Sequence, residues 1–151
     1  MGYAIVEGVE LTRSGVHPGL ICKMDSGWLV LADMQYLRGY CILMADPVVS
    51  SINDLNIEKR AKFLQDMVIA GDALMKVTGA YRINYAIMGN SDPYLHAHIV
   101  PRYNDEPEEY LHDQPWAYPD EVVSGSRLDA IESTDLRRDL RNQIEKIRGG
   151  S

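Results

Sequence analysis

Residues 90–103 read NSDPYLHAHIVPRY, and this stretch holds two of the four histidines of the chain, one residue apart. Apolar residues surround the two imidazoles, and the segment 95–100 has the pattern of a short buried strand that ends at Pro101. Side chains two residues apart on a strand point to the same side, so His96 and His98 share one face. The stretch therefore predicts a rigid strand that presents two histidines to one pocket.

The turn before this strand and the residue after it add polar groups. Gly89, Asn90 and Ser91 are turn-forming residues whose N–H groups and hydroxyl can contact an anion. Arg102 follows Pro101 and supplies either a positive charge for a ligand or an ordinary salt bridge at the strand end. These surroundings are compatible with a small anionic ligand.

Three interpretations of the histidine pair stay open on these residues alone. His96 and His98 can be hydrogen-bonded side chains on a polar sheet face, without chemistry. They can bind a metal ion, but a zinc site needs further ligands, and only His17 and His112 remain as imidazoles. In the third interpretation, a neutral imidazole near pH 7 attacks phosphorus, and water then opens the phosphoramidate. A nearby partner, phosphate donors and a proton source can all be named, which favours the nucleophile.

The residues before position 79 predict three strands and one long helix. Apolar runs separated by turn residues are typical of an antiparallel meander, and they cover residues 20–24, 28–32 and 40–45. Asn56 can cap a helix, apolar residues recur at helical spacing through 57–77, and Gly79 supplies a stop. The methionines of this helix are expected to be core residues.

Two more strands and a last helix complete the prediction. The strands are expected at 82–88 and 95–100, and the amphipathic helix at 135–147. The fold class is therefore α+β, with an antiparallel sheet of about five strands. We expect an N-terminal extension at 1–19, a core domain at 20–103, and an acidic loop with a C-terminal helix packed on the core at 104–151.

Composition and charge exclude several classes of protein. The chain has 151 residues and a formal net charge of −7, which repels a nucleic-acid backbone. No apolar run is long enough to span a membrane and no secretory signal is visible, so we expect a cytoplasmic protein. Cys22 and Cys41 are expected to be buried free thiols rather than a disulfide.

A family resemblance enters at the histidine strand. YLHAHIV at 94–100, followed by PRY, resembles the signature of the histidine triad (HIT) family, in which histidines alternate with apolar residues. ADPVVSSINDLN at 45–56 resembles the family segment that leads into the long helix, and RINYAIMGN at 82–90 resembles its fourth strand and phosphate turn. The resemblance covers roughly residues 20–103. It implies a HIT-like sheet with one long helix between strands 3 and 4.

The resemblance also implies roles for individual residues. His96 matches the central histidine, the nucleophile that takes up the nucleotidyl group. His98 matches the third histidine, whose backbone carbonyl and imidazole orient the nucleophile and bind phosphate. Asn90 and Ser91 match the polar pair that contacts the phosphate and assists the leaving group. Asn84 matches an asparagine that lines the same pocket.

This chain departs from the family pattern at two places. Tyr94 stands where the family has its first histidine, and Val48 or Val49 stands where many members have a further histidine. In the family these two side chains form a relay that supports the central imidazole. Tyr94 offers a hydroxyl there, whereas valine takes no part. We expect Tyr94 and Arg102 among the substrate-binding residues.

The expected function is that of a nucleotide hydrolase or nucleotidyl transferase. It would act on the α-phosphate of a nucleoside phosphoramidate or dinucleoside polyphosphate through a nucleotidyl-histidine intermediate, with His96, His98 and Ser91 as catalytic residues. The alternative is a catalytically weakened or inactive protein of the same fold that binds and responds to purine nucleotides. The two differ in turnover and not in binding.

The resemblance implies partners as well. We expect a purine nucleotide or nucleotide conjugate as ligand, a homodimer in which two sheets join edge to edge, and neither nucleic acid nor membrane. No metal site and no cofactor held by the protein is expected, although Mg²⁺ would accompany a polyphosphate substrate. Apolar residues of the early strands, with Leu20, Ile21 and Leu43 as candidates, are expected to line a purine slot as that region does in the family. Trp28 and Trp116 are expected to be packing residues, with base stacking as the alternative.

Overall fold

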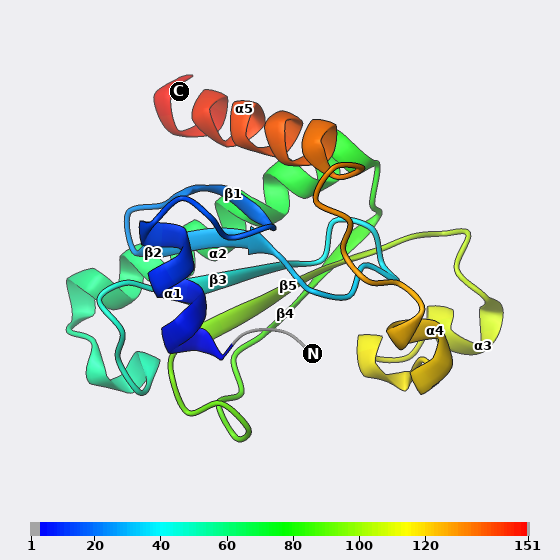
Figure 1. The fold of residues 1–151 in the computed structure, drawn as a ribbon, viewed down its shortest axis with the longest axis horizontal. Coiled ribbons are helices and arrows are strands. Elements are labelled where there is room, and N and C mark those ends of the chain that lie inside the picture. Colours follow the sequence, from blue (N-terminus) through cyan, green and yellow to red (C-terminus); the bar gives the residue numbers. More distant parts are fainter. Residues whose placement is uncertain (1–3, 151) are drawn as a thin grey trace.

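A five-stranded antiparallel sheet forms the centre of the molecule in the computed structural model, which describes residues 4–150 (Figure 1). Its strands are β1 (Leu20–Lys23), β2 (Gly27–Leu31), β3 (Cys41–Ala45), β4 (Arg82–Ala86) and β5 (His96–Arg102). Their order across the sheet is β1-β2-β3-β5-β4, so β3 pairs with β5. The predicted α+β class, the meander of the first three strands and the histidine strand are confirmed.

Five α-helices and two 3₁₀ turns accompany the sheet within the described residues. They are α1 (Ile5–Arg13), η1 (Ile52–Asp54), α2 (Ile57–Thr78), α3 (Glu108–Leu111), η2 (Pro115–Ala117), α4 (Asp120–Ser124) and α5 (Thr134–Gly150). The predicted helices at 57–77 and 135–147 are confirmed to within three residues at each end. None of the described helices combines the length and the apolar character that crossing a bilayer requires.

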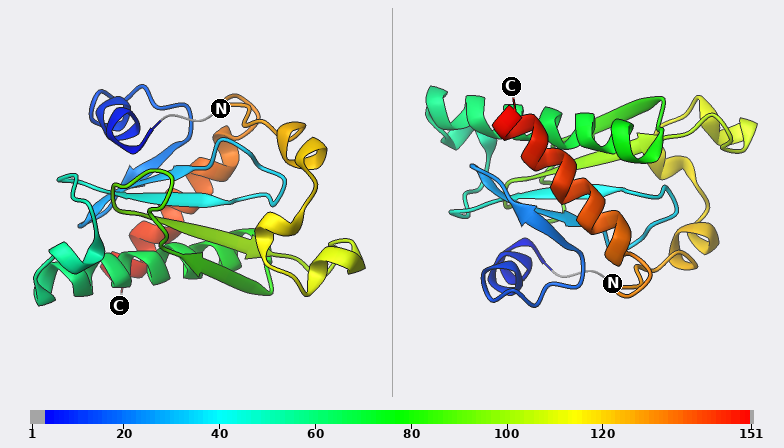
Figure 2. Two further views of the ribbon diagram at one scale, coloured as in Figure 1. Left: turned by 90° about the horizontal axis from the view of Figure 1, so that it is seen from below. Right: turned by 90° about the horizontal axis from the view of Figure 1, so that it is seen from above.

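The main core lies between the sheet and the pair α2 and α5. Asn56 caps α2 by accepting a hydrogen bond from the Lys59 N–H, and Gly79 ends it in the left-handed conformation with a φ of 77°. The buried face of α2 packs on β5 and β4, and α5 crosses α2 and covers β1 (Figure 2). Residues that face this core include Leu43, Ala97 and Ile99.

The expectation that Ile21 and Leu43 line a purine slot is wrong. Both side chains are almost wholly buried in the main core, at 1% and 0% exposure. They therefore face α2 and α5, whereas His96 and His98 lie on the opposite face because strand neighbours alternate. The apolar side chains that share the histidine face come from β2 and β3 at other positions, such as Val30 and Ile42.

The opposite face of the sheet is covered in two separate places. At one end, α1 packs Ile5 and Val9 against Val30 and Met44. At the other end, the sheet is covered by residues 103–124, whose tyrosines pack on it. This segment contains α3 and α4 (Figure 1). Because Met44 pairs with His96 in β5, the two histidines lie between these covers. We call this surface the histidine face.

Helix α1 was not predicted, because residues 1–19 were expected only as an extension with turns. It has nine residues and contains Gly8, so its own helical propensity is low. Packing stabilises it instead: an added Cβ at Gly8 would lie 2.9 Å from the Met44 sulfur, so glycine permits the close approach. Asp92, from the loop before β5, accepts a hydrogen bond from the first helical N–H, that of Ile5, at 2.8 Å.

Candidate functional site

The two histidines of β5 lie side by side on the histidine face, as the strand alternation predicts. Their ring centroids are 5.0 Å apart with an interplanar angle of 71°. His96 is 8% exposed and His98 is half-buried. His98 pairs with Ile42 of β3 on one side and with Ala86 of β4 on the other. His98 therefore has a paired strand on each side and His96 is paired with Met44 of β3, which suits precise positioning.

The His96 ring has a fixed proton position. Its Nδ1 lies 2.7 Å from the carbonyl oxygen of Tyr94. A carbonyl oxygen can only accept, so Nδ1 carries the hydrogen and Nε2 of the neutral ring carries a lone pair. Nε2 is thus the nucleophilic atom. The resemblance assigned the orienting backbone carbonyl to His98, but the carbonyl in contact with this ring is that of Tyr94.

His98 has a different partner, the phenol of Tyr40. The His98 Nδ1 and the Tyr40 Oη are 2.7 Å apart, and the two rings meet edge to face with centroids 5.9 Å apart. Burial raises the pKa of Tyr40 well above its ordinary value, partly opposed by a hydrogen bond from Trp116. The phenol therefore keeps its proton and can donate it to His98.

The His98 ring is neutral at physiological pH. Burial, together with the neighbouring His96, lowers the pKa of His98 to about 4. A neutral ring that accepts at Nδ1 from a phenol has its hydrogen on Nε2. The two histidines then differ usefully: His96 offers a lone pair to phosphorus, and His98 offers an N–H to a phosphate oxygen.

The positions at which the chain departs from the triad pattern do not contribute an orienting side chain here. The Tyr94 side chain is 38% exposed and makes no hydrogen bond to another described residue, so only its backbone contacts His96. Val48 packs near Met44, and Val49 packs against the main core. Side chains that orient the imidazoles must therefore come from other residues, while Tyr94 contributes its backbone carbonyl.

The polar pair before β5 lies on an exposed loop. Gly89 turns the chain with a φ of 78°, a conformation that favours glycine, and Asn90 and Ser91 follow it with exposed side chains. Neither side chain forms a hydrogen bond with another described residue. Asp92 fixes the end of the loop, because its carboxylate accepts from the Ile5 and Tyr94 N–H groups. The expected roles of Asn90 and Ser91 thus depend on a ligand.

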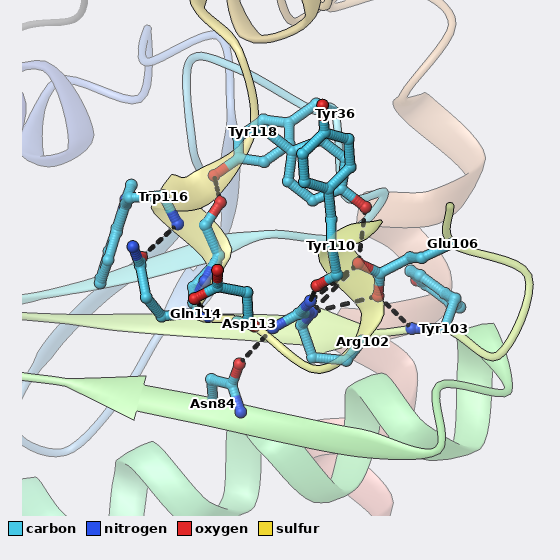
Figure 3. Close-up of polar contacts among 11 residues, drawn as sticks. Tyr36, Asn84, Arg102, Tyr103, Glu106, Tyr110, Asp113, Gln114, Trp116 and Tyr118 are labelled. Carbon is cyan, nitrogen blue, oxygen red and sulfur yellow. Dashed lines mark hydrogen bonds and ion pairs between the residues drawn. The ribbon is translucent and has the colours of Figure 1, made fainter. Parts of the chain in front are cut away.

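Arg102 occupies a structural position (Figure 3). It is 3% exposed, and all five of its N–H hydrogens have protein acceptors. These acceptors are the Glu106 carboxylate, the Asn84 side-chain oxygen and the carbonyl oxygens of Tyr110 and Asp113. The guanidinium has no donor left for a substrate. Arg102 is therefore not a substrate-binding residue; it forms the salt bridge at the strand end that was the alternative.

Glu106 completes this network, which we call the Arg102 cluster. Its carboxylate also accepts hydrogen bonds from the Tyr118 hydroxyl at 2.6 Å and from the Tyr103 N–H at 2.7 Å. Burial alone would raise the pKa of Glu106, but the bonds from Arg102, Tyr118 and Tyr103 outweigh it and lower the pKa. The cluster holds residues 103–118 against the sheet.

Trp116 lines two cavities on the histidine face. One has a volume of about 650 Å³ and lies between β4 and residues 111–116, with Asn84 and Arg82 in its wall. The other has about 240 Å³ and lies over β2 and β3, lined by Ala32, Ile42 and Asp33 among others. His98 contacts Trp116 edge to face, with centroids 5.3 Å apart, and so lies beside the wall that the cavities share, although neither histidine lines them directly.

Asn84 therefore lies where its predicted role requires, in the wall of the larger cavity. Its side-chain oxygen accepts from Arg102 at 2.9 Å, which leaves the amide N–H groups as the part that a ligand can use.

Sequence reasoning missed Tyr40 as a site residue and treated Trp116 as a packing residue. Tyr40 is the first residue of the strand predicted at 40–45, and Trp116 lies in a proline-rich stretch, so no local pattern connects either with the histidines. Only the pairing of β3 with β5 brings Tyr40 next to His98. Trp28, by contrast, donates its indole N–H to Asp46 at 2.8 Å and packs against the apolar side chains that lie between α1 and the sheet. This agrees with its expected role as a packing residue.

The metal interpretation finds no ligand set in the part of the chain that the structure describes. There, no three His, Cys, Asp or Glu side chains come close enough together to hold an ion.

Comparisons with known proteins identify the fold. No family model matches the sequence, and no curated protein matches it at a significant level. Solved structures do match. A histidine triad protein from Bradyrhizobium japonicum has 24% identity and a TM-score of 0.63, and the match covers 83% of this chain and 89% of that one. A hypothetical histidine triad nucleotide-binding protein from Sulfolobus tokodaii has 11% identity and a TM-score of 0.71, covering 94% and 93%. A diadenosine triphosphate hydrolase from Plasmodium falciparum has 13% identity and a TM-score of 0.60, covering 85% and 78%.

Proposed function

We propose that this chain, which has the fold of the histidine triad proteins, is a nucleotide hydrolase or nucleotidyl transferase that acts through His96. The observation that supports this most is the pair of imidazoles on one rigid strand, with the His96 Nδ1 against a carbonyl oxygen and the His98 Nδ1 against the Tyr40 hydroxyl. One ring presents a lone pair and the other an N–H, which is what attack on a phosphate ester or amide requires. Similarity to nucleotide-binding and nucleotide-hydrolysing proteins of the same fold supports the choice of substrate class.

The proposed reaction has two steps at the α-phosphorus. In the first, the lone pair of the His96 Nε2 forms a bond to phosphorus while the bond from phosphorus to the leaving group breaks. The His98 N–H stabilises the charge on a phosphoryl oxygen, and the leaving group takes up a proton for which Ser91 is the nearby hydroxyl donor. In the second, water attacks phosphorus and gives a proton to the Ser91 oxygen, the P–N bond breaks, and a nucleoside monophosphate leaves with His96 neutral again.

The two cavities suit the two ends of such a substrate. The smaller one is mainly apolar and aromatic, and Asp33 adds a carboxylate that can accept hydrogen bonds from ribose hydroxyls, so it fits the nucleoside. The larger one presents donors, namely the amide N–H groups of Asn84 and the guanidinium of the exposed Arg82. A leaving group with acceptor oxygens fits there, and Asn90 would contact the phosphate from the loop.

The deciding experiment compares two substrates on wild type and on the His96→Ala variant. Adenosine phosphoramidate and a diadenosine polyphosphate are incubated with each protein, and AMP release is measured. We expect wild type to hydrolyse at least one of them and the variant to be slower by at least about a thousandfold, as for other lost nucleophiles. Alkaline quenching followed by intact mass measurement should show a nucleotidyl adduct in wild type and none in the variant. Equal rates in both proteins would contradict the proposal.

A specific observation favours a second candidate, a protein that binds purine nucleotides without turning them over. The side chain of Tyr94 makes no contact with the imidazole that it should support, and the valines lie in hydrophobic clusters. Loss of an orienting group can lower a rate by orders of magnitude and leave binding intact. Tight AMP binding by calorimetry with no release from either substrate would favour this candidate. Absence of both turnover and binding would contradict both candidates.

We also propose a homodimer that forms through β4. This strand lies at the edge of the sheet, so one side of its backbone is unpaired. Exposed apolar side chains lie beside it on α2 and on β4 itself, among them Leu64, Val68, Met75 and Tyr85. Two copies that pair their β4 strands would cover these side chains and form one continuous sheet.

Divalent metal would come with the substrate. A polyphosphate is bound by Mg²⁺ in solution, and the ion lowers the charge that this acidic protein must accommodate. We expect chelation by EDTA to slow hydrolysis of a diadenosine polyphosphate and to leave phosphoramidate hydrolysis unchanged. Equal sensitivity of both reactions to EDTA would contradict this.

A further inference from the structure

We propose that Tyr40 and Trp116 form a positioning chain for His98 that substitutes for the orienting histidines absent from this chain. The inference rests on the proposed function, because it concerns the imidazole that contacts the phosphate. Its basis is a set of contacts that no motif in the sequence indicates. The two residues come from segments 76 positions apart that meet only on the histidine face.

The first link is the hydroxyl of Tyr40. It lies 2.7 Å from the His98 Nδ1, and the Tyr40 side chain is 6% exposed. The Tyr40 backbone is fixed by a hydrogen bond from the Ala32 N–H to its carbonyl, which joins it to the end of β2. The phenol therefore cannot follow the imidazole if the ring turns. A single strong contact from a buried, fixed donor restricts both the angle and the proton position of His98.

The second link is the indole of Trp116. It lies edge-on to His98, at 85° with centroids 5.3 Å apart. The Tyr40 phenol meets the same imidazole edge to face, with centroids 5.9 Å apart. The Tyr40 hydroxyl therefore sets the proton position of His98, and Trp116 restricts the angle of the imidazole ring.

The turn η2 holds Trp116 in place. Gln114 caps this turn by accepting from the Trp116 N–H of the backbone at 2.6 Å, and the Tyr36 hydroxyl donates to the Pro115 carbonyl at 2.8 Å (Figure 3). The Arg102 cluster anchors the same segment through the Asp113 carbonyl. Trp116 can therefore be 41% exposed, as a cavity wall must be, and still have a defined position.

The Tyr40 hydroxyl decides what His98 can do. Acceptance at Nδ1 places the hydrogen on Nε2, so the ring donates to a phosphoryl oxygen and does not compete with His96 as a nucleophile. The aromatic rings that meet the His98 ring within residues 4–150 are those of His96, Tyr40 and Trp116. Of these, Tyr40 supplies the hydrogen bond to Nδ1 that selects this tautomer.

The test measures the proton position of His98 by ¹⁵N nuclear magnetic resonance of the imidazole nitrogens. Wild type should show the hydrogen on Nε2, and Tyr40→Phe, which keeps the ring and removes only the hydroxyl, should show a mixture of tautomers. Trp116→Phe should give a smaller change in the same direction. Tyr103→Phe is the matched control, because its hydroxyl bonds to the Arg38 carbonyl in the same region and does not contact His98. Trp28→Phe controls for the loss of an indole.

Kinetics supply the second readout. Tyr40→Phe should lower kcat by about ten- to a hundredfold with a KM changed less than about twofold, since misplacement of a positioned group acts on the transition state. Tyr103→Phe should retain the wild-type kcat. An unchanged His98 tautomer or an unchanged kcat in Tyr40→Phe would overturn the inference while the proposed function stands. If wild type has no turnover, the proposed function fails. The tautomer of His98 in wild type and in Tyr40→Phe then still shows whether Tyr40 sets the proton position of His98.

Discussion

Arg102 and Glu106 form an ion pair of 2.9 Å in which the two side chains are only 3% and 4% exposed. A buried pair of this kind is strongly destabilised when one partner loses its charge, because the other charge stays uncompensated. We expect Glu106→Gln to lower the free energy of unfolding by about 3–5 kcal/mol in urea titrations. Glu10→Gln is the control, because Glu10 pairs with Arg13 on the exposed surface and should cost less than about 1 kcal/mol. Similar losses in both variants would contradict this reading of the Arg102 cluster.

The neutral state of His98 makes stability depend on pH. Its pKa is about 4 in the folded protein against an ordinary value of 6.5, so the unfolded chain takes up this proton first as the pH falls. The stability that the neutral His98 ring gives the folded protein is therefore complete above about pH 6.5, and it is lost progressively as the pH falls from about 6.5 to 4. We expect His98→Gln to flatten this part of the stability curve in urea titrations at a series of pH values.

Two other groups shape the same curve. Burial also lowers the pKa of His17, so part of the slope should remain in His98→Gln. Glu106 has a lowered pKa, and its contribution is lost at lower pH, below the ordinary value of 4.5. His112→Gln, the same substitution at an exposed position, is the control for the change of residue itself. A slope unaffected by His98→Gln would show that the ring is not kept neutral by its site.

Asp92 caps α1 from a distant part of the chain. Its carboxylate accepts from the Ile5 N–H at 2.8 Å, and Ala4, at the N-cap position itself, provides no side-chain cap. We expect Asp92→Ala to cost about 0.5–2 kcal/mol and to speed amide hydrogen exchange in the first turn of α1. Asp92→Asn, which keeps an acceptor oxygen, should retain most of the protection. Unchanged exchange in the alanine variant would contradict the cap.

The β4 edge should control association. Wild type should sediment at about twice the 17.0 kDa of one chain, and Val68→Lys should shift the protein toward the monomer, because it places a charge among the exposed apolar side chains of α2. Val16→Lys is the matched control, since Val16 is 64% exposed and lies outside α2 and β4. A monomeric wild type at tens of micromolar would contradict the proposed dimer.

Much of the fold was predictable because its signals are local. The long helix α2 has a cap at Asn56, apolar spacing along its length and a glycine stop at Gly79, and each of these acts within a few residues. The strand around His96 likewise follows from its alternation. The predicted end at Pro101 is wrong, because β5 continues to Arg102 and Pro101 pairs with Ile83 of the edge strand β4. Helix α1 was missed because packing on Met44 and the Asp92 contact stabilise it, and neither lies near it in sequence.

The sequence by itself determined which residues form strands and helices and that His96 and His98 share a face, because backbone periodicity and capping depend on neighbouring residues. Only the tertiary structure decided what surrounds those imidazoles. Strand order brought Tyr40 to His98, the folded segment 103–118 brought Trp116, and the hydrogen bonds of its five N–H hydrogens assigned Arg102 to the scaffold. Side-chain partners and burial arise from contacts between distant segments, and these fix proton positions that no local pattern encodes.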